Sequence, residues 1–484
     1  MSYKRKKTKI VATLGPAIST KKMLLELIAT GVNVFRINFS HADYKVVENN
    51  IKYIREINKE HGYNAAILAD LQGPKLRVGV MKDDITVTRG DEIKFETGEK
   101  FEGTKERVYM NYDGFPKDTK IGEKILLDDG KLIFEVVSTN KINQVKAKVI
   151  QGGALKSKKG VNLPNTNISQ PALTEKDKKD ALFAISQEVD WIALSFVRNA
   201  KDLKELEEII TKNSSYKIPI IAKIEKPEAV RNIDSIITSC DGLMVARGDL
   251  GVEIPAQEVP LIQKQLVRRA KQARIPVIIA TQMMESMISN RVPTRAEVFD
   301  VANAVTSGVD AIMFSAETAI GKYPSDVISE ASRICIESEG AYIRPLSVDR
   351  VVPKTLPVDQ VIALSAVYSA KLTKVVAIAA LTETGSTALW MSRVQSNIPI
   401  YAMTQNNKTS RRICLYKGVQ SIKLDKLEEN HAQANMQVIS LMRKIGTVKK
   451  GDLVIITKGD LLGTSGGTNA MKVVEVGNMI EVND

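Results

Sequence analysis

Short apolar runs alternate with amphipathic helical patterns through the first two thirds of the chain, and this alternation limits the possible folds more than any other feature. There are eight such runs: KIVATLG, VNVFRINFS, AAILADLQG, WIALSFV, PIIAKIE, GLMVARGD, PVIIATQM and AIMFSAET. Apolar runs of this length are typical of parallel strands that are buried on both faces. Eight strand and helix alternations predict an α/β fold built on a closed (β/α)8 barrel, with the chemistry at the C-terminal strand ends.

One connection departs from this pattern. From about Leu76 to Gln170 the helical period gives way to short alternating runs with hairpin signals such as Asp129-Gly130. After a Pro-containing stretch that follows Tyr342, the runs VVAIAAL, PIYAM, DLVIIT and MKVVEV predict strands of an open α/β sheet. We therefore expect a barrel at 1–75 and 171–342, an inserted small β-barrel domain at 76–170, and a C-terminal α/β domain at 343–484.

The bulk composition argues against several functional classes. The formal net charge is +13, but aromatic residues make up only 5% of the chain, and we find no arginine-rich helix or aromatic RNA-binding motif. We therefore expect the charge to attract small anionic substrates rather than nucleic acid. Three widely spaced cysteines favour a reduced cytoplasm over a disulfide framework or a structural zinc site. No apolar run approaches membrane-spanning length and no export signal is recognisable, so we expect no membrane partner.

The stretch IPIIAKIEKPEAV, followed by CDGLMVARGDLGVEIP, carries the most informative charges. The first run ends with Lys223 and Glu225, and the second with Arg247 and Asp249. Side chains two residues apart on a strand share a face, so Lys223 and Glu225 enter one cavity. Glu225 and Asp249 could hold a divalent cation between adjacent strand ends, and Gly248 would let a ligand approach the backbone closely. The alternative interpretation is a buried structural ion pair followed by a turn.

Neighbouring strand ends strengthen the functional interpretation. Arg36, Asn38 and Ser40 alternate along the second run, and a buried polar row in a barrel needs a ligand or an ion. The segment DLQGPKLR brings Asp70 and Lys75 to the same mouth. Other candidates at or after strand ends are Arg77, Ser195, Phe196, Thr281, Gln282, Glu285, Ser315 and Glu317. Each residue alone could be structural, but together they predict a ligand site.

At this point the motifs resemble those of the pyruvate kinases. The matching segments are RINFSH, DLQGPKLR, SKKGVNLP, IEKPEAV, MVARGDLGVEIP, ATQMMESM, PTRAEVFDVANAV and FSAETAIGKYP. They cover essentially the whole chain, including both additional domains. The resemblance implies transfer of a phosphoryl group from phosphoenolpyruvate to ADP, the last step of glycolysis, with Mg²⁺, or Mn²⁺ in its place. It also implies a cytoplasmic homotetramer.

The resemblance assigns roles by position. Glu225 and Asp249 would bind Mg²⁺, and Lys223 would stabilise the phosphoryl group during transfer. Arg36 would hold that phosphoryl group. The substrate carboxylate would be held by the backbone N–H groups of Gly248 and Asp249 and by the hydroxyl of Thr281. Residues facing the nucleotide would be His41, Arg77 and Lys159. The proton for the enolate would come from Thr281 or from a water near Ser315, and the sequence leaves both open.

The chain departs from the common family pattern at the monovalent-ion site. Many members need K⁺ and have Thr, Lys and Glu where this chain has Leu71, Gln72 and Lys75. The ammonium of Lys75 could supply the charge that the ion otherwise brings, so we predict activity without K⁺. In the alternative, Lys75 points to solvent and K⁺ still binds. The monovalent-ion region would consist of Asn38, Ser40, Asp70 and Lys75.

A second departure concerns regulation. The turn between the first strand and helix of the C-terminal domain has the shape of a phosphate site at a helix N-terminus. It consists of Thr382, Glu383, Thr384, Gly385, Ser386 and Thr387. The carboxylate of Glu383 would repel a bisphosphate, so fructose 1,6-bisphosphate is disfavoured, and AMP, a sugar monophosphate or no effector remain open.

Two other functions compete with this interpretation. A Mg²⁺-dependent aldolase that passes through a pyruvate enolate would also pair Glu with Asp, but it has no use for the inserted domain or for Arg77. A catalytically inactive relative that acts as a binding protein would not need the expected residue type at every catalytic position.

Overall fold

Within the residues that the computed structural model describes, namely 6–83, 85–341, 355–394, 396–428, 430–460 and 466–478, eight parallel strands close into a barrel in the order β1-β16-β15-β14-β13-β12-β3-β2. The expected linker after Tyr342 lies largely outside these residues. The barrel strands are β1 (Lys9–Thr13), β2 (Val34–Asn38), β3 (Ala66–Asp70), β12 (Trp191–Leu194), β13 (Ile220–Ile224), β14 (Gly242–Ala246), β15 (Val277–Ala280) and β16 (Ala311–Phe314).

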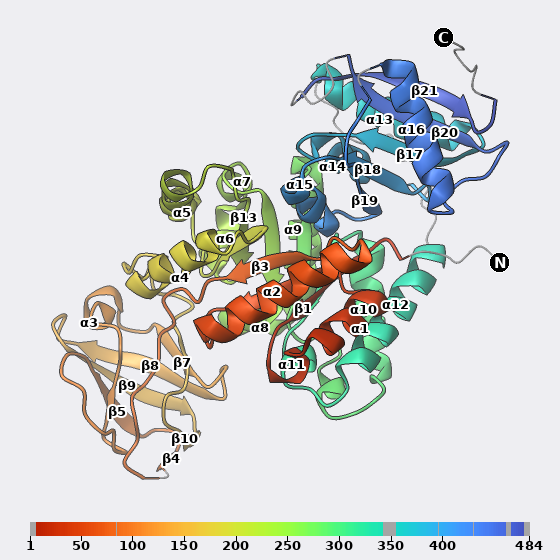
Figure 1. Cartoon of the computed structure of the whole chain (residues 1–484). Coiled ribbons are helices and arrows are strands. Elements are labelled where there is room, and N and C mark those ends of the chain that lie inside the picture. Colours follow the sequence, from red (N-terminus) through yellow and green to blue (C-terminus); the bar gives the residue numbers. More distant parts are fainter. Residues whose placement is uncertain are drawn as a thin grey trace.

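Helices surround the barrel (Figure 1). The α-helices are α1 (Lys21–Thr30), α2 (Tyr44–His61), α4 (Glu175–Ser186), α5 (Ala200–Asn213), α6 (Pro227–Arg231), α7 (Ile233–Ile237), α8 (Arg247–Glu253), α9 (Val259–Ala273), α10 (Arg295–Ser307), α11 (Ala316–Ala319) and α12 (Pro324–Ala341). Short 3-10 turns are η1 (Pro16–Ile18), η2 (Ala256–Glu258) and η3 (Glu285–Ile288). Capping boxes at Thr174 and Thr294 fix the starts of α4 and α10 by satisfying N-terminal backbone donors.

Alternation along the strands separates two cores. Outward-facing strand residues such as Phe35 and Ile67 pack against the helices, whereas Val34, Leu68 and Ile221 belong to a second apolar cluster. Two residues further along β2, β3 and β13, the side chains of the second set are charged. Because alternate strand residues share a face, these charged side chains point into the C-terminal end of the barrel interior, which is otherwise apolar.

The segment between β3 and α4 forms a separate β domain with its own core. Its elements are β4 (Ile85–Val87), β5 (Glu92–Glu96), β6 (Arg107–Tyr109), α3 (Phe115–Asp118), β7 (Lys124–Leu127), β8 (Leu132–Thr139), β9 (Gln144–Gln151), β10 (Gly153–Leu155) and β11 (Val161–Asn162). Six of these strands form one sheet in the order β11-β7-β8-β9-β5-β6. Phe95, Phe115 and Phe134 meet edge to face in the interior.

The C-terminal domain is a five-stranded sheet in the order β19-β18-β17-β20-β21, among the described residues. Its strands are β17 (Val375–Leu381), β18 (Ile400–Thr404), β19 (Val419–Lys423), β20 (Leu453–Gly459) and β21 (Thr468–Glu475). Its helices are α13 (Val358–Leu372), α14 (Ser386–Ser392), α15 (Asn407–Arg412), η4 (Ile413–Leu415) and α16 (His431–Lys444). Sequence reasoning missed β19, because VQSIK alternates polar and apolar residues and lacks a continuous apolar run.

The C-terminal domain covers the N-terminal end of the barrel, and the inserted domain lies at the opposite end of the molecule (Figure 1). Lys9 donates to the backbone oxygen of Val419 at 2.6 Å, and the guanidinium of Arg393 pairs with buried Asp310. Apolar residues of the barrel interior and of α13, β17 and β18 form one cluster. The C-terminal ends of the barrel strands therefore lie away from the C-terminal domain.

Candidate active site

Four charged side chains meet inside the C-terminal end of the barrel. Arg36 Nε lies 2.6 Å from Asp70 Oδ2, and Lys223 Nζ lies 3.1 Å from Asp70 Oδ1 as an ion pair without hydrogen-bond geometry. Lys223 Nζ also lies 3.0 Å from Glu225 Oε1 and donates to Ser195 Oγ at 2.7 Å. Asp70 and Glu225 are each only 1% exposed. Two cations and two carboxylates thus stabilise each other at low dielectric, where each charge needs its partners.

This cluster changes the proton affinities of its members. Burial alone would lower the pKa of Lys223, but the charges of Asp70 and Glu225 outweigh it, and the net pKa is raised. Burial would raise the pKa of Asp70, whereas Lys223 and Arg36 hold it below its ordinary value. Lys223 is therefore a permanent cation, and Asp70 is a permanent anion that orients it.

Glu225 differs from Asp70 because a second carboxylate lies near it. Burial raises the pKa of Glu225, Lys223 opposes this effect, and the negative charge of Asp249 adds to it. The Phe196 N–H donates to Glu225 Oε2 at 2.8 Å. Among the described residues no three His, Cys, Asp or Glu side chains gather as a metal site. Two neighbouring carboxylates fit Mg²⁺, which usually takes one or two protein carboxylates and completes its octahedron with substrate oxygens and water.

A hydroxyl joins the first turn of α8, which follows β14, to the end of β15. Thr281 Oγ1 accepts the Gly248 N–H at 2.7 Å and donates to the Ala280 carbonyl at 2.6 Å. A Cβ atom on Gly248 would lie 3.3 Å from that hydroxyl oxygen, so the glycine permits the close approach. Arg247 does not enter the cavity, because its guanidinium pairs with Asp300 at 2.7 Å and binds the carbonyl of Thr281.

Backbone strain gathers at the same strand ends. Phe196, Thr281 and Gln282 have φ angles of 54°, 67° and 55°, in the left-handed region. Such conformations cost about 1–3 kcal/mol each and persist where surrounding contacts determine them. Here they turn the chain immediately after β12 and β15, and position the Phe196 N–H and the Thr281 hydroxyl.

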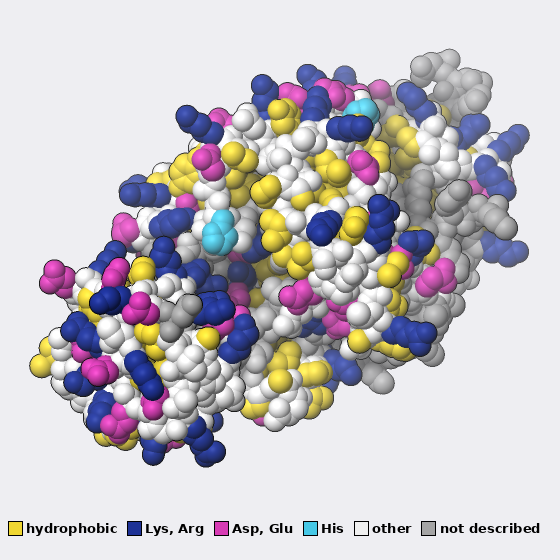
Figure 2. Space-filling view, turned by 90° about the horizontal axis from the view of Figure 1, so that it is seen from below, with side chains coloured by type: hydrophobic (Ala, Val, Ile, Leu, Met, Phe, Trp, Pro, Cys, Tyr) yellow, Lys and Arg dark blue, Asp and Glu magenta, His cyan; other side chains and the backbone are white. Residues whose placement is uncertain are grey.

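The predicted nucleotide-facing residues lie at the rim. His41 is exposed beyond β2. Arg77 Nη1 donates to the Lys158 carbonyl at 3.0 Å, and Lys159 pairs with Asp128 at 2.8 Å. Both basic side chains therefore contact the inserted domain. Lys and Arg side chains are numerous on the surface of this domain and beside the barrel (Figure 2).

The predicted monovalent-ion residues are not all brought together. Asn38 Oδ1 accepts the Ser40 N–H at 3.2 Å beside β3. Lys75 is exposed, and its Cε lies against Gly160 of the inserted domain, whereas Asp70 is occupied by Arg36 and Lys223. In this conformation the Lys75 ammonium does not replace an ion beside Asp70.

Helix α11, which follows the eighth strand, contributes a buried carboxylate beside Ser315. Glu317 Oε2 accepts the Ser315 N–H at 2.6 Å, and burial raises the pKa of Glu317. Ser315 itself is partly exposed.

The predicted effector turn lies in the C-terminal domain, beyond the other end of the barrel (Figure 1). The Gly385 N–H donates to Thr382 Oγ1 at 2.9 Å, and Thr384 Oγ1 donates to Ser386 Oγ at 3.2 Å. Thr387 shares a buried 2.8 Å bond with Thr468 Oγ1. The turn thus satisfies several of its own polar groups.

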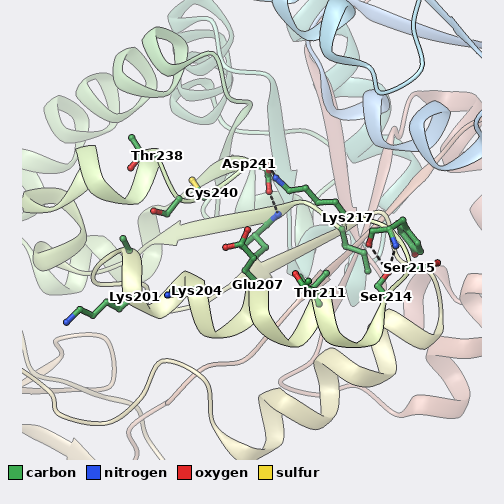
Figure 3. Close-up of a pocket in the computed structure, with 16 residues that line it drawn as sticks. Lys201, Lys204, Glu207, Thr211, Ser214, Ser215, Lys217, Thr238, Cys240 and Asp241 are labelled. Atoms are coloured by element: carbon green, nitrogen blue, oxygen red, sulfur yellow. Dashed lines mark hydrogen bonds and ion pairs between the residues drawn. The ribbon is translucent and has the colours of Figure 1, made fainter. Parts of the chain in front are cut away.

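A cavity of about 740 Å³ lies outside the barrel mouth, beside α5 and the segment that precedes β13 (Figure 3). Lys217 pairs there with Asp241 at 2.6 Å, and Lys201 points away from the cavity. Burial raises the pKa of Cys240 to about 12, so its thiol is not a nucleophile at neutral pH.

Sequence reasoning missed three residues at the junction with the inserted domain. They are Asn162, Lys226 and Glu253. Asn162 donates a hydrogen bond to Glu253, and Lys226 forms an ion pair with it. Only Lys226 carried a signal, because it directly follows Glu225. The partnership with Asn162 depends on how the inserted domain docks, and no local pattern encodes that contact.

Comparisons with known proteins agree with this arrangement. The family model described as pyruvate kinase, barrel domain, matches residues 5–328, and the one described as pyruvate kinase, alpha/beta domain, matches residues 360–474. A pyruvate kinase of Buchnera aphidicola is 42% identical over 482 residues, covering 98% of this chain and 100% of its own. Pyruvate kinase II of Salmonella typhimurium is also 42% identical, with the same coverage. The crystal structure of a Cryptosporidium parvum pyruvate kinase superposes with a TM-score of 0.92 at 34% identity, over 98% of this chain and 96% of that one.

Proposed function

Because the chain belongs to the pyruvate kinase family of phosphotransferases, we propose that it transfers the phosphoryl group of phosphoenolpyruvate to ADP in the last step of glycolysis. The reaction would be Mg²⁺-dependent and would yield pyruvate and ATP. The observation that carries this proposal is the buried cluster of Arg36, Asp70, Lys223 and Glu225. In the described part of the chain, we find no helix with the length and apolar character needed to span a membrane.

The cluster supports phosphoryl transfer through fixed positive charge. The guanidinium of Arg36 is held in place because its Nε donates to Asp70 Oδ2 and its Nη1 donates to Thr13 Oγ1. Such a planar fork of donors suits phosphoryl oxygens. Lys223 adds a permanent ammonium on the same face. Phosphoryl transfer needs little covalent help, so preorganised cations in a water-poor site supply most of the catalysis.

Glu225 and Asp249 would hold Mg²⁺, or Mn²⁺ in its place, which would neutralise the charge of the substrate carboxylate and phosphate. Burial raises the pKa of Glu225 and the charge of Asp249 adds to this effect, and a bound cation would relieve the repulsion between the two carboxylates. The Gly248 N–H and Thr281 Oγ1 would then bind the substrate carboxylate, after their present mutual bond opens.

The pyruvate enolate must be protonated at carbon. The Thr281 hydroxyl proton is already donated to the Ala280 carbonyl, which favours a water near Ser315 as the donor. ADP would approach from the rim formed by His41, Arg77 and Lys159.

We further propose that activity does not require K⁺. Lys75 would have to turn from Gly160 toward Asp70 when substrates bind and the inserted domain moves. The test is the rate in buffer free of Na⁺ and K⁺, followed by addition of KCl at fixed ionic strength. A many-fold rise with KCl would refute the proposed role of Lys75, while a flat response is expected.

Regulation would act at the turn from Thr382 to Thr387, with AMP or a sugar monophosphate as effector. The test is a substrate saturation curve with and without each compound, beside the Glu383→Ala variant. If no compound shifts the saturation curve or changes the affinity for substrate, the regulatory proposal is wrong.

We propose a cytoplasmic homotetramer. Support comes from large apolar side chains that remain exposed on two surfaces of the chain. Leu261 and Phe299, on α9 and α10, are 70% and 76% exposed, and Leu372 on α13 is 82% exposed. Light scattering after gel filtration should give four times the mass of the chain, and a monomer would contradict this.

The decisive test of the reaction itself is pyruvate formation from phosphoenolpyruvate, ADP and Mg²⁺. Omission of ADP or Mg²⁺ should abolish turnover. Retroaldol cleavage of a pyruvate-derived aldol with no phosphoryl transfer would favour the aldolase interpretation instead.

A further inference from the structure

Helix α8 connects the candidate metal site to the inserted domain. It spans Arg247–Glu253, with Asp249 in its first turn and Glu253 as its last residue. Its Glu253 end contacts the inserted domain, because Asn162 Nδ2 of β11 donates to Glu253 Oε1 at 2.8 Å. Asp249 and Glu253 are four positions apart on this helix of seven residues, so one short element carries both carboxylates.

Lys226 completes this contact from the barrel side. Its ammonium pairs with the same Glu253 oxygen, and the two side chains are 8% and 1% exposed. Lys226 directly follows Glu225, the other candidate metal ligand. Its ammonium also lies 6.0 Å from the centre of the Phe196 ring, and the Phe196 N–H donates to Glu225. Each end of the contact is therefore tied to one candidate ligand.

The bonding of Glu253 makes this contact sensitive to change. Its second oxygen, Oε2, is buried and has no hydrogen-bond partner among the described residues. A buried carboxylate with few donors depends strongly on each of them. Asn162 is the donor from the inserted domain, so its bond depends on where that domain sits.

We propose that Asn162, Glu253 and Lys226, the junction triad, position Asp249 and Glu225 for Mg²⁺ when the inserted domain is docked. These are positioning residues, since none reaches the reacting atoms. The inference rests on the proposed function of the site, and it adds that docking of the inserted domain sets the affinity for the metal.

The test first replaces the Asn162 amide with a carboxylate, which repels Glu253. It then exchanges the donor and the acceptor of the bond between the two residues. Asn162→Asp sets a carboxylate against Glu253. In the double variant Asn162→Asp with Glu253→Gln, the new amide can donate to the new carboxylate, and Lys226 keeps an anionic partner. Gln151→Glu, an exposed amide-to-acid change in the same domain that loses only a surface bond to the Lys131 carbonyl, is the matched control. Asn162→Ala serves if Asn162→Asp fails to fold.

Two readouts separate this inference from the proposed function. The first is the Mg²⁺ concentration for half-maximal rate at saturating substrates, which should rise about tenfold or more in Asn162→Asp, as expected for losing a hydrogen bond to a charged group. The second is hydrogen–deuterium exchange of residues 72–82 and 158–170 in protein without substrates, which should become faster. The double variant should return toward the native values in both, and Gln151→Glu should match the native chain.

The outcomes are distinct. Faster exchange with an unchanged Mg²⁺ requirement would overturn the positioning role, and a double variant no better than Asn162→Asp would overturn the specific bond. If the native chain does not act on phosphoenolpyruvate and ADP, the proposed function fails, while exchange still decides whether the triad holds the junction.

Discussion

Replacing Asp70 with asparagine should show how much the negative charge of Asp70 stabilises the fold, because the volume of the side chain stays nearly the same. Asp70 is 1% exposed and is the common partner of Arg36 and Lys223. Asparagine keeps the volume and can still accept from Arg36 Nε, but it removes the negative charge between two buried cations. Breaking a buried ion pair from one side costs about 3–5 kcal/mol. Because one hydrogen bond survives, we expect about 3 kcal/mol, the lower end of that range.

The same change should reduce activity. Without the carboxylate, Arg36 and Lys223 repel each other and lose the positions that the transition state needs. Removal of one preorganised group typically costs on the order of 10²–10³ in rate. The assay combines kcat with urea unfolding of the barrel, followed through Trp191 fluorescence in a Trp390→Phe background.

The pH dependence gives an independent check. The pKa of Asp70 is held below its ordinary value, so its ionised form stabilises the fold above the unfolded pKa of about 3.9. That contribution is lost as the pH falls toward the folded pKa. The difference between native chain and Asp70→Asn should therefore be full at pH 6 and shrink below about pH 4.

Asp234→Asn is the control, because Asp234 is 74% exposed and its pair with Arg269 spans 3.4 Å. We expect less than about 1 kcal/mol there. An Asp70→Asn variant as stable and as active as this control would refute the reasoning about the cluster.

The remaining predictions concern the metal, the substrate carboxylate and the domain interface. Glu225→Gln should raise the Mg²⁺ requirement at least tenfold, as one charged ligand is lost, and an unchanged requirement in a Mg²⁺ titration would remove Glu225 from the site. Thr281→Val should raise KM for phosphoenolpyruvate while kcat falls little, whereas a drop in kcat on the order of 10²–10⁴ would identify Thr281 as the proton donor. Asp310→Asn removes the carboxylate that accepts from Val277, Arg393 and Lys417, so calorimetry should show the C-terminal domain unfolding separately, and one unchanged transition would contradict this.

Periodicity explains why the barrel could be predicted from the sequence. Buried parallel strands leave an apolar signature, and alternation alone brings Arg36, Lys223 and Glu225 to one face of their strands. Their convergence on Asp70 follows from the closed strand order, in which β2 neighbours β3 and β3 neighbours β12 and then β13. The family resemblance added the roles of these residues.

Other features could not be read from local patterns. Lys75 is close in sequence to Asp70, yet the chain turns at Gly73, with φ of 71°, and carries the lysine toward the inserted domain. The bond between Asn162 and Glu253 joins residues 91 positions apart through domain docking. Arg247 directly follows an apolar run, but a helix begins there and its guanidinium pairs with Asp300.

The most direct test of the whole account is pyruvate formation from phosphoenolpyruvate and ADP with Mg²⁺, comparing the native chain with Lys223→Met and Lys217→Met. Lys217 is 65% exposed and pairs with Asp241 at the far side of the barrel, so it controls for the loss of a lysine. We expect the native chain and Lys217→Met to turn over alike, and Lys223→Met to fall by at least about 10²-fold. Equal rates for all three proteins, or no pyruvate from the native chain, would contradict the account.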